Sequence, residues 1–113
     1  LQMLVVDGLA NDQNEVMGAY KLMEGKVVSG RAVWQKQGGG EDFEETFLYY
    51  SSDSDWYFSN REDMETGIPA GFMNVISVAL TPDQTRPSDV WRVCNAARTQ
   101  MVDVPEVQVR HQI

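Results

Sequence analysis

The sequence predicts an all-β domain, an antiparallel meander that closes into a small barrel or a sandwich of about seven or eight strands. Two observations predict this class. Runs of four to eight residues rich in β-branched and aromatic side chains recur along the chain, and each run is bounded by glycine, proline, aspartate, asparagine or serine. These turn clusters are regularly spaced, as is typical of meanders, sandwiches and barrels.

Turn-forming clusters divide the first half of the chain into short strands. Between the second and third expected strands the sequence offers two turns, one at Glu24-Gly25-Lys26 and one at Ser29-Gly30. Ser51 to Asp55 forms another turn, and the aromatic runs on either side of it make the clearest hairpin of the chain. The expected strands are residues 1–6, 17–22, 31–36, 46–50 and 56–58.

The second half contains further strands and one ambiguous segment. Residues 60–67 are polar, and residues 72–78 form a candidate strand that ends before Thr81-Pro82-Asp83. Over residues 90–101, apolar side chains recur at helical spacing, which makes this the one credible helix. The regular β spacing elsewhere favours a strand there. Residues 102–109 alternate in polarity and contain Pro105, which predicts a last strand at a sheet edge.

Length and composition exclude several classes of protein. At 113 residues with 42% hydrophobic side chains, we expect residues 1–113 to form one domain with a real core. The start at Leu1, without a signal-peptide pattern, suggests a domain excised from a larger protein. A net charge of −8 and the lack of a basic cluster argue against nucleic acid. The longest apolar runs are too short for membrane insertion.

Catalytic and metal-binding patterns are missing from the sequence. The single histidine, His111, is close to the end of the chain, and no nucleophile or phosphate-loop motif occurs. We therefore expect no enzyme, no catalytic residues and no cofactor. Asp53 and Asp55, with Glu41-Asp42 nearby, suggest calcium, but they lack the EF-hand pattern and are better explained as turn residues. No metal site is expected.

Cys94 is the only cysteine, so the chain cannot form an internal disulfide or a thiolate cluster. Many secreted β domains also lack disulfides, so the compartment stays open. A reducing compartment such as the cytoplasm is weakly favoured.

Four short motifs stand out along the chain: Gly18-Ala19-Tyr20, Ser29-Gly30-Arg31-Ala32-Val33-Trp34, Phe47-Leu48-Tyr49-Tyr50 and Trp91-Arg92-Val93. Together they resemble a loosely described β module of multidomain proteins from algae, dinoflagellates and other protists. The module usually has Asn, Pro and Tyr where this chain has Ser29, Ala32 and Trp34. The resemblance implies a non-catalytic interaction or structural repeat, and it supplies no functional residues.

The aromatic strands supply the candidate binding residues. Alternation places Tyr49 and Tyr50 on opposite faces, and Tyr57 on the face opposite Trp56. The second face is either covered by another layer or offers aromatic rings to a ligand. Trp34, Tyr50 and Tyr57 are the candidate ligand-binding residues, although a two-layer core would also account for these rings.

We therefore expect a non-catalytic binding or scaffolding module that contacts a protein partner or a neighbouring domain within a larger protein. The alternative is a carbohydrate-binding module that uses an exposed aromatic face to bind a glycan. Trp34 and Trp91 lie far apart in the sequence, and a single β core should bury both.

Overall fold

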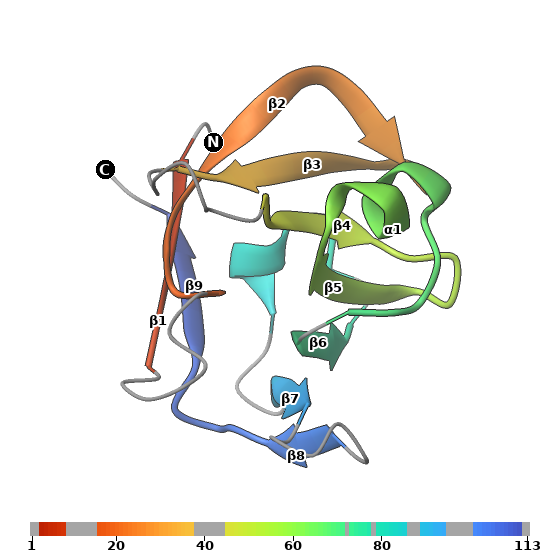
Figure 1. Cartoon of the computed structure of the whole chain (residues 1–113). Coiled ribbons are helices and arrows are strands. Elements are labelled where there is room, and N and C mark those ends of the chain that lie inside the picture. Colours follow the sequence, from red (N-terminus) through yellow and green to blue (C-terminus); the bar gives the residue numbers. More distant parts are fainter. Residues whose placement is uncertain are drawn as a thin grey trace.

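All strands of the described residues belong to one antiparallel sheet (Figure 1). The computed structural model describes residues 3–8, 16–37, 45–71, 73–77, 79–85, 89–94 and 101–111. The strands are β1 (Met3–Asp7), β2 (Gly18–Val28), β3 (Arg31–Lys36), β4 (Phe47–Tyr50), β5 (Asp55–Ser59), β6 (Met73–Ile76), β7 (Arg92–Cys94), β8 (Met101–Asp103) and β9 (Gln108–His111). The predicted all-β class is confirmed.

The sheet is curled into a half-barrel rather than a closed barrel or a sandwich (Figure 1). Its strand order is β8-β7-β6-β5-β4-β3-β2-β1-β9, so the chain forms a meander from β1 to β8. The last strand then joins the free side of β1, where Val6 pairs with Val109. As a result β8 and β9 are the two edges of the sheet.

Both candidate turns between the second and third strands are used, in different ways. Ser29 and Gly30 have φ values of 51° and 79° and form the tight hairpin turn, so β2 extends to Val28. Gly25, with φ of 77°, lies where the β2–β3 register shifts between Leu22 and Val27. A glycine with positive φ is typical of such a bulge. The second expected strand was therefore too short.

The β4–β5 hairpin is confirmed, with Tyr50 opposite Trp56. The Ser51 hydroxyl accepts hydrogen bonds from the backbone N–H groups of Asp53 and Asp55, each at 3.3 Å. Ser54 adopts a left-handed φ of 65°. Side chain-to-backbone bonds of this kind stabilise the turn itself.

The polar segment after β5 forms a helix that the sequence analysis missed. Helix α1 (Arg61–Thr66) begins at Asn60, whose side chain accepts a hydrogen bond from the Asp63 backbone, and ends at Gly67 with φ of 69°. Its only buried side chain is that of Met64. A single apolar residue makes no helical pattern, so the sequence contains no periodic signal for this helix. The expectation that residues 90–101 were the one credible helix was wrong, because α1 lies elsewhere.

The C-terminal segments form three short strands. For residues 90–101 the sequence favoured a strand over a helix, and β7 confirms this for residues 92–94. Residues 95–100 lie outside the described part. The single strand expected over residues 102–109 is wrong, because Met101–Asp103 and Gln108–His111 lie at opposite edges of the sheet. Between them the Val107 N–H donates to the Val104 carbonyl at 3.1 Å, which turns the chain at Pro105.

The concave face of the sheet holds the main core, and α1 covers a second core on the other face (Figure 1). Trp34 and Trp91 are 1% and 2% exposed, as expected. In the second core Met64 packs with Val33, Phe47 and Tyr49. No helix in the described residues is long and apolar enough to span a membrane.

Candidate functional site

The gap between the two edges of the sheet, which we call the seam, is crossed by the chain between β8 and β9 (Figure 1). Residues 104–107 form this crossing. It is fixed next to the start of β7, because the Val104 N–H donates to the Trp91 carbonyl at 2.8 Å. On the other side, the short 3₁₀ helix η2 (Pro82–Gln84) packs against β9. Three chain segments that are distant in sequence therefore meet at the seam.

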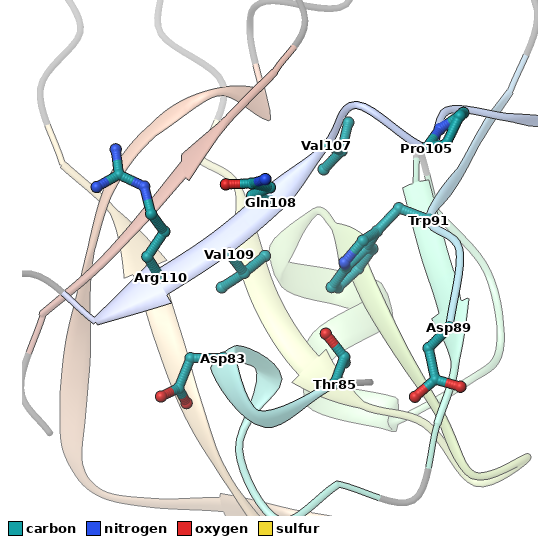
Figure 2. A pocket seen from close by; sticks show the side chains of 9 residues that line it. All are labelled: Asp83, Thr85, Asp89, Trp91, Pro105, Val107, Gln108, Val109 and Arg110. Atoms are coloured by element: carbon teal, nitrogen blue, oxygen red, sulfur yellow. The ribbon is translucent and has the colours of Figure 1, made fainter. Parts of the chain in front are cut away.

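A cavity of about 380 Å³ opens at the seam (Figure 2). We call it the seam cavity. Its lining combines apolar side chains with carboxylate, hydroxyl, amide and guanidinium groups. The lining residues are Asp83, Thr85, Asp89, Trp91, Pro105, Val107, Gln108, Val109 and Arg110.

The apolar floor of the seam cavity belongs to the main core. Trp91, Val107 and Val109 are all at least nine-tenths buried and are members of the concave-face cluster. The Trp91 ring also packs on the Phe58 ring, with 5.3 Å between their centroids. Because these side chains are fixed by core packing, the floor is a preformed surface.

The polar wall comes from the connection between β6 and β7. Figure 2 shows Asp83, Thr85 and Asp89 on the side of the cavity opposite Val107 and Gln108. Pro82 occupies the first turn of η2 and is buried, which fixes the backbone next to Asp83. The backbone at Asp83 is thus held in place by the packing of Pro82.

Two buried oxygens of this segment have no hydrogen-bond partner in the structure. They are Oδ1 of Asp83 and Oγ1 of Thr81. A buried carboxylate oxygen without a donor is costly, because folding removes its water without replacing the lost hydrogen bonds. In native proteins such atoms call for an explanation, such as a water or a ligand.

The guanidinium in the lining has a partner of its own. Arg110 on β9 forms an ion pair with Asp7 on β1, with Nε and Oδ2 3.2 Å apart. Figure 2 shows the Arg110 guanidinium directed away from Asp83 and Asp89. Its charge is therefore balanced by Asp7 rather than by the carboxylates of the cavity wall.

The residues predicted to bind ligand lie elsewhere. Trp34 and Tyr50 are 1% and 6% exposed and pack around Trp56, with ring centroids 6.0 and 5.1 Å from it. Tyr57 is half-buried on the opposite face and stacks on Tyr49 at 6.4 Å. None of the three lines the seam cavity.

The second aromatic face is covered by the chain itself rather than offered to a ligand. The Tyr49 hydroxyl donates to the carbonyl oxygens of Ile68 and Ala70, each at 2.8 Å, and so holds down the segment after α1. Burial, and then the nearby negative charge of Asp63, raise the pKa of Tyr49. Tyr57 lies at the margin of this covered cluster.

Asp55, one of the acids considered as a calcium ligand, links two strands of the sheet. Asp55 accepts a hydrogen bond from the Asn74 side chain at 3.2 Å, and partial burial raises the pKa of its carboxyl. Glu41 and Asp42 lie outside the described residues. Among the residues that are described, no group of three or more His, Cys, Asp or Glu side chains could hold a metal ion.

Sequence reasoning missed the seam cavity because its polar residues are of the types that commonly end strands. Thr81-Pro82-Asp83 was interpreted only as a stop signal for the preceding strand. The usable signal was the length of the connection, residues 77–91, which far exceeds an ordinary hairpin loop. Long connections of this kind are often functional.

No protein-family model, curated protein or solved structure matches this chain. The resemblance to the protist β module therefore stays a prediction that depends on the short motifs alone.

Proposed function

We propose that this domain is a non-catalytic binding module that contacts a protein partner through the seam cavity. The observation that supports this most directly is the cavity itself, a preformed apolar floor beside a polar wall at the seam of the half-barrel. Ligand sites generally combine an apolar lining with a few placed polar groups. The seam cavity has this composition.

The size of the cavity favours an anchoring side chain. Ligand pockets range over roughly 300–1,000 Å³, and a volume of about 380 Å³ is at the lower end of that range. Protein interfaces obtain most of their binding energy from a few large side chains that fill such pockets, surrounded by contacts that exclude water. A single partner side chain would fit this role here.

The lining also lacks the groups that ordinary catalysis needs. Among the residues that the structure describes, the lining contains no histidine, cysteine, serine or lysine, and therefore no common nucleophile held next to an imidazole base. Binding without chemistry is the simpler interpretation of such a lining.

A carbohydrate-binding role has weaker support. Sugar rings stack on accessible aromatic faces, yet no aromatic side chain is exposed in the part of the chain that the structure describes. Trp34 and Tyr50 belong to the core, and Tyr57 is only partly accessible. For this reason we place the protein partner first.

Selection of a random peptide library on the domain tests the proposal. Thr85→Trp should fill the cavity from its polar wall and abolish binding of the selected peptides, whereas Thr66→Trp, at an exposed position on α1, should preserve it. Binding is measured by titration calorimetry on variants with unchanged melting temperatures. Peptides that bind both variants equally would contradict the proposal, as would selective binding on a glycan array without any peptide binder.

A further inference from the structure

We infer that the partner adds an extended segment to β9 as a further strand of the sheet, with one of its side chains in the seam cavity. This inference depends on the proposed function and specifies how the partner docks at the same site. It follows from the position of the cavity along β9, from the backbone groups that β9 leaves unpaired, and from the charge of the chain.

The seam cavity borders the edge of β9 rather than one of its faces. Consecutive side chains of a strand point to opposite faces of the sheet, so a cavity on one face is lined by every second residue. Gln108, Val109 and Arg110 are consecutive in β9, and all three line the seam cavity. In Figure 2 the Val109 side chain extends from one side of the strand and those of Gln108 and Arg110 from the other. The three residues can line the same cavity only where it runs along the edge between the two faces.

This edge of β9 leaves backbone groups without a partner. In an antiparallel pair, alternate residues direct their N–H and C=O groups to the neighbouring strand, and the residues between them direct theirs away from it. β9 pairs with β1 only, and in the part of the chain that the structure describes no hydrogen bond from a turn or loop backbone reaches it. Every second residue of β9 therefore presents an N–H and a C=O at the seam, and a row of such groups is a template for another strand.

The cavity supplies the pocket that strand addition needs for selectivity. In this binding mode the main chain of the added strand provides affinity, and pockets for its alternate side chains provide specificity. The seam cavity extends along three residues of β9, roughly 10 Å at about 3.4 Å per residue. Trp91 and Val109 belong to its floor, and Asp83 and Thr85 lie across it from β9 (Figure 2). An added segment would thus place one side chain on this floor and direct the flanking side chains away from it.

The occupant is a segment of another protein rather than a second copy of this chain. Each copy carries a net charge of −8, so two copies repel each other as they approach. The other edge of the sheet is β8, and neither Val102 nor Asp103 of that strand lines the seam cavity. β9 is therefore the edge where an added strand would also find a cavity.

An N-methyl scan of a selected peptide tests this mode of binding. The probe is a peptide from the library selection above whose binding is abolished by Thr85→Trp, synthesised as variants in which one backbone N–H at a time is replaced by N–CH₃. N-methylation of the residues whose N–H groups face β9 should weaken binding at least about tenfold, because each removes a donor from the pairing edge. N-methylation of the residues between them should leave the affinity nearly unchanged. The loss should recur at every second residue, which is the period of an extended strand.

Amide hydrogen exchange measured by NMR locates the added strand on this chain. In the free domain, the β9 amides that point to the seam should exchange fast, and the alternate amides bonded to β1 should exchange slowly. A saturating amount of the peptide should slow the fast set at least about tenfold, because exchange then requires the peptide to leave. The amides of β8, at the other edge of the sheet, are the matched control and should not change.

A loss of binding at consecutive positions, at none, or with helical spacing would overturn the inference, as would β9 amides whose exchange the peptide leaves unchanged. Protection of the seam-facing amides that grows with protein concentration in the absence of peptide would also overturn it, because a second copy would then occupy the edge. The proposed function fails separately, when no selected peptide is sensitive to Thr85→Trp, and the inference then fails with it. A peptide that needs the open cavity but shows no alternation would preserve the function and refute the added strand.

Discussion

Two buried tryptophans in contact with each other illustrate how much a single hydrogen bond contributes in this core. Trp34 and Trp56 are both almost fully buried, and their rings meet edge to face. The Trp56 indole N–H donates to the Ala79 carbonyl at 3.0 Å, whereas the Trp34 indole N–H is buried without an acceptor. Replacement by phenylalanine therefore removes a hydrogen bond at one site and an unsatisfied donor at the other.

We expect Trp56→Phe to be more destabilising than Trp34→Phe by about 1 kcal/mol, since only the first variant breaks a hydrogen bond and leaves a carbonyl without its donor. The loss of ring volume is the same in both. Urea denaturation measures the two free energies of unfolding. Equal values would show that the indole N–H of Trp34 has found a partner, such as a bound water.

Buried tyrosines make the stability of the domain sensitive to alkaline pH. Burial raises the pKa of Tyr20, whose hydroxyl donates to the Val16 carbonyl at 2.7 Å, and burial also raises the pKa of Tyr49. In the unfolded chain both phenols should titrate near their ordinary pKa of about 10. Only the unfolded state then releases these protons as the pH rises.

The free energy of unfolding should therefore be at its full value below pH ~10 and fall as the pH increases further. Tyr20→Phe should flatten this decline, because it removes one of the coupled groups. Urea midpoints measured across the alkaline range, together with phenolate absorbance, provide the test. A midpoint that is constant up to the point of global unfolding would show that these phenols ionise freely in the folded domain.

At the scale of single elements, α1 depends on its ends more than on its surface charges. It has only six residues, so capping and the buried Met64 must compensate for a length that is marginal in isolation. Its exposed ion pairs, among them Lys26 with Glu65 at 2.6 Å and Arg61 with Glu45 at 2.7 Å, contribute little, because solvent and salt screen such pairs.

Asn60→Ala should destabilise the domain by roughly 1 kcal/mol, because it removes the side-chain acceptor for the Asp63 N–H. Asn60→Asp retains a capping oxygen and should behave like the wild type. Lys26→Ala should cost at most about 1 kcal/mol. Thermal unfolding measures the stability of the three variants, and Asn60→Ala should be the least stable. A larger loss for Lys26→Ala would show that surface charges, rather than the cap, stabilise the helix.

Elements with many consecutive apolar residues could be predicted from the sequence, and those defined by single residues could not. The β4–β5 hairpin follows from aromatic runs on both sides of a Ser/Asp turn, and its two faces separate as alternation requires. Helix α1 has one buried residue and offers no periodicity. Its N-cap Asn60 and C-terminal Gly67 were the available signal, but the sequence analysis described residues 60–67 only as polar.

The candidate site is harder to predict than the strands, because it is formed by tertiary closure. Asp83 and Val109 meet only when the chain has crossed the seam and β9 has paired with β1. No local pattern reports that pairing. The predicted aromatic residues Trp34 and Tyr50 instead went to the core, where burial of large rings contributes most to stability.

At the scale of the whole molecule, the β1–β9 pair holds the half-barrel together. β9 pairs with β1 from Asp7–Gln108 to Leu4–His111, and it places Val109 over the main core. Truncating the chain after Val107 should therefore abolish cooperative unfolding, because β1 becomes an edge and the core is opened to water.

Tryptophan fluorescence in a urea titration measures this loss. Arg110→Ala is the matched control, since it retains the strand and removes only the exposed ion pair with Asp7, for a change of at most about 1 kcal/mol. A truncated chain that still unfolds in one sharp transition would show that β9 is dispensable for the fold.

The same β1–β9 pairing determines how the domain would respond to mechanical force. Leu4, near the start of β1, lies opposite His111 at the end of β9. A pull applied at these two positions would load the hydrogen bonds between the strands one after another, as in opening a zipper, rather than all together in shear. The first bonds to break would free β9, and with it the Val109 and Arg110 side of the seam cavity. Tension between these two positions would therefore open the seam cavity as the first step of unfolding.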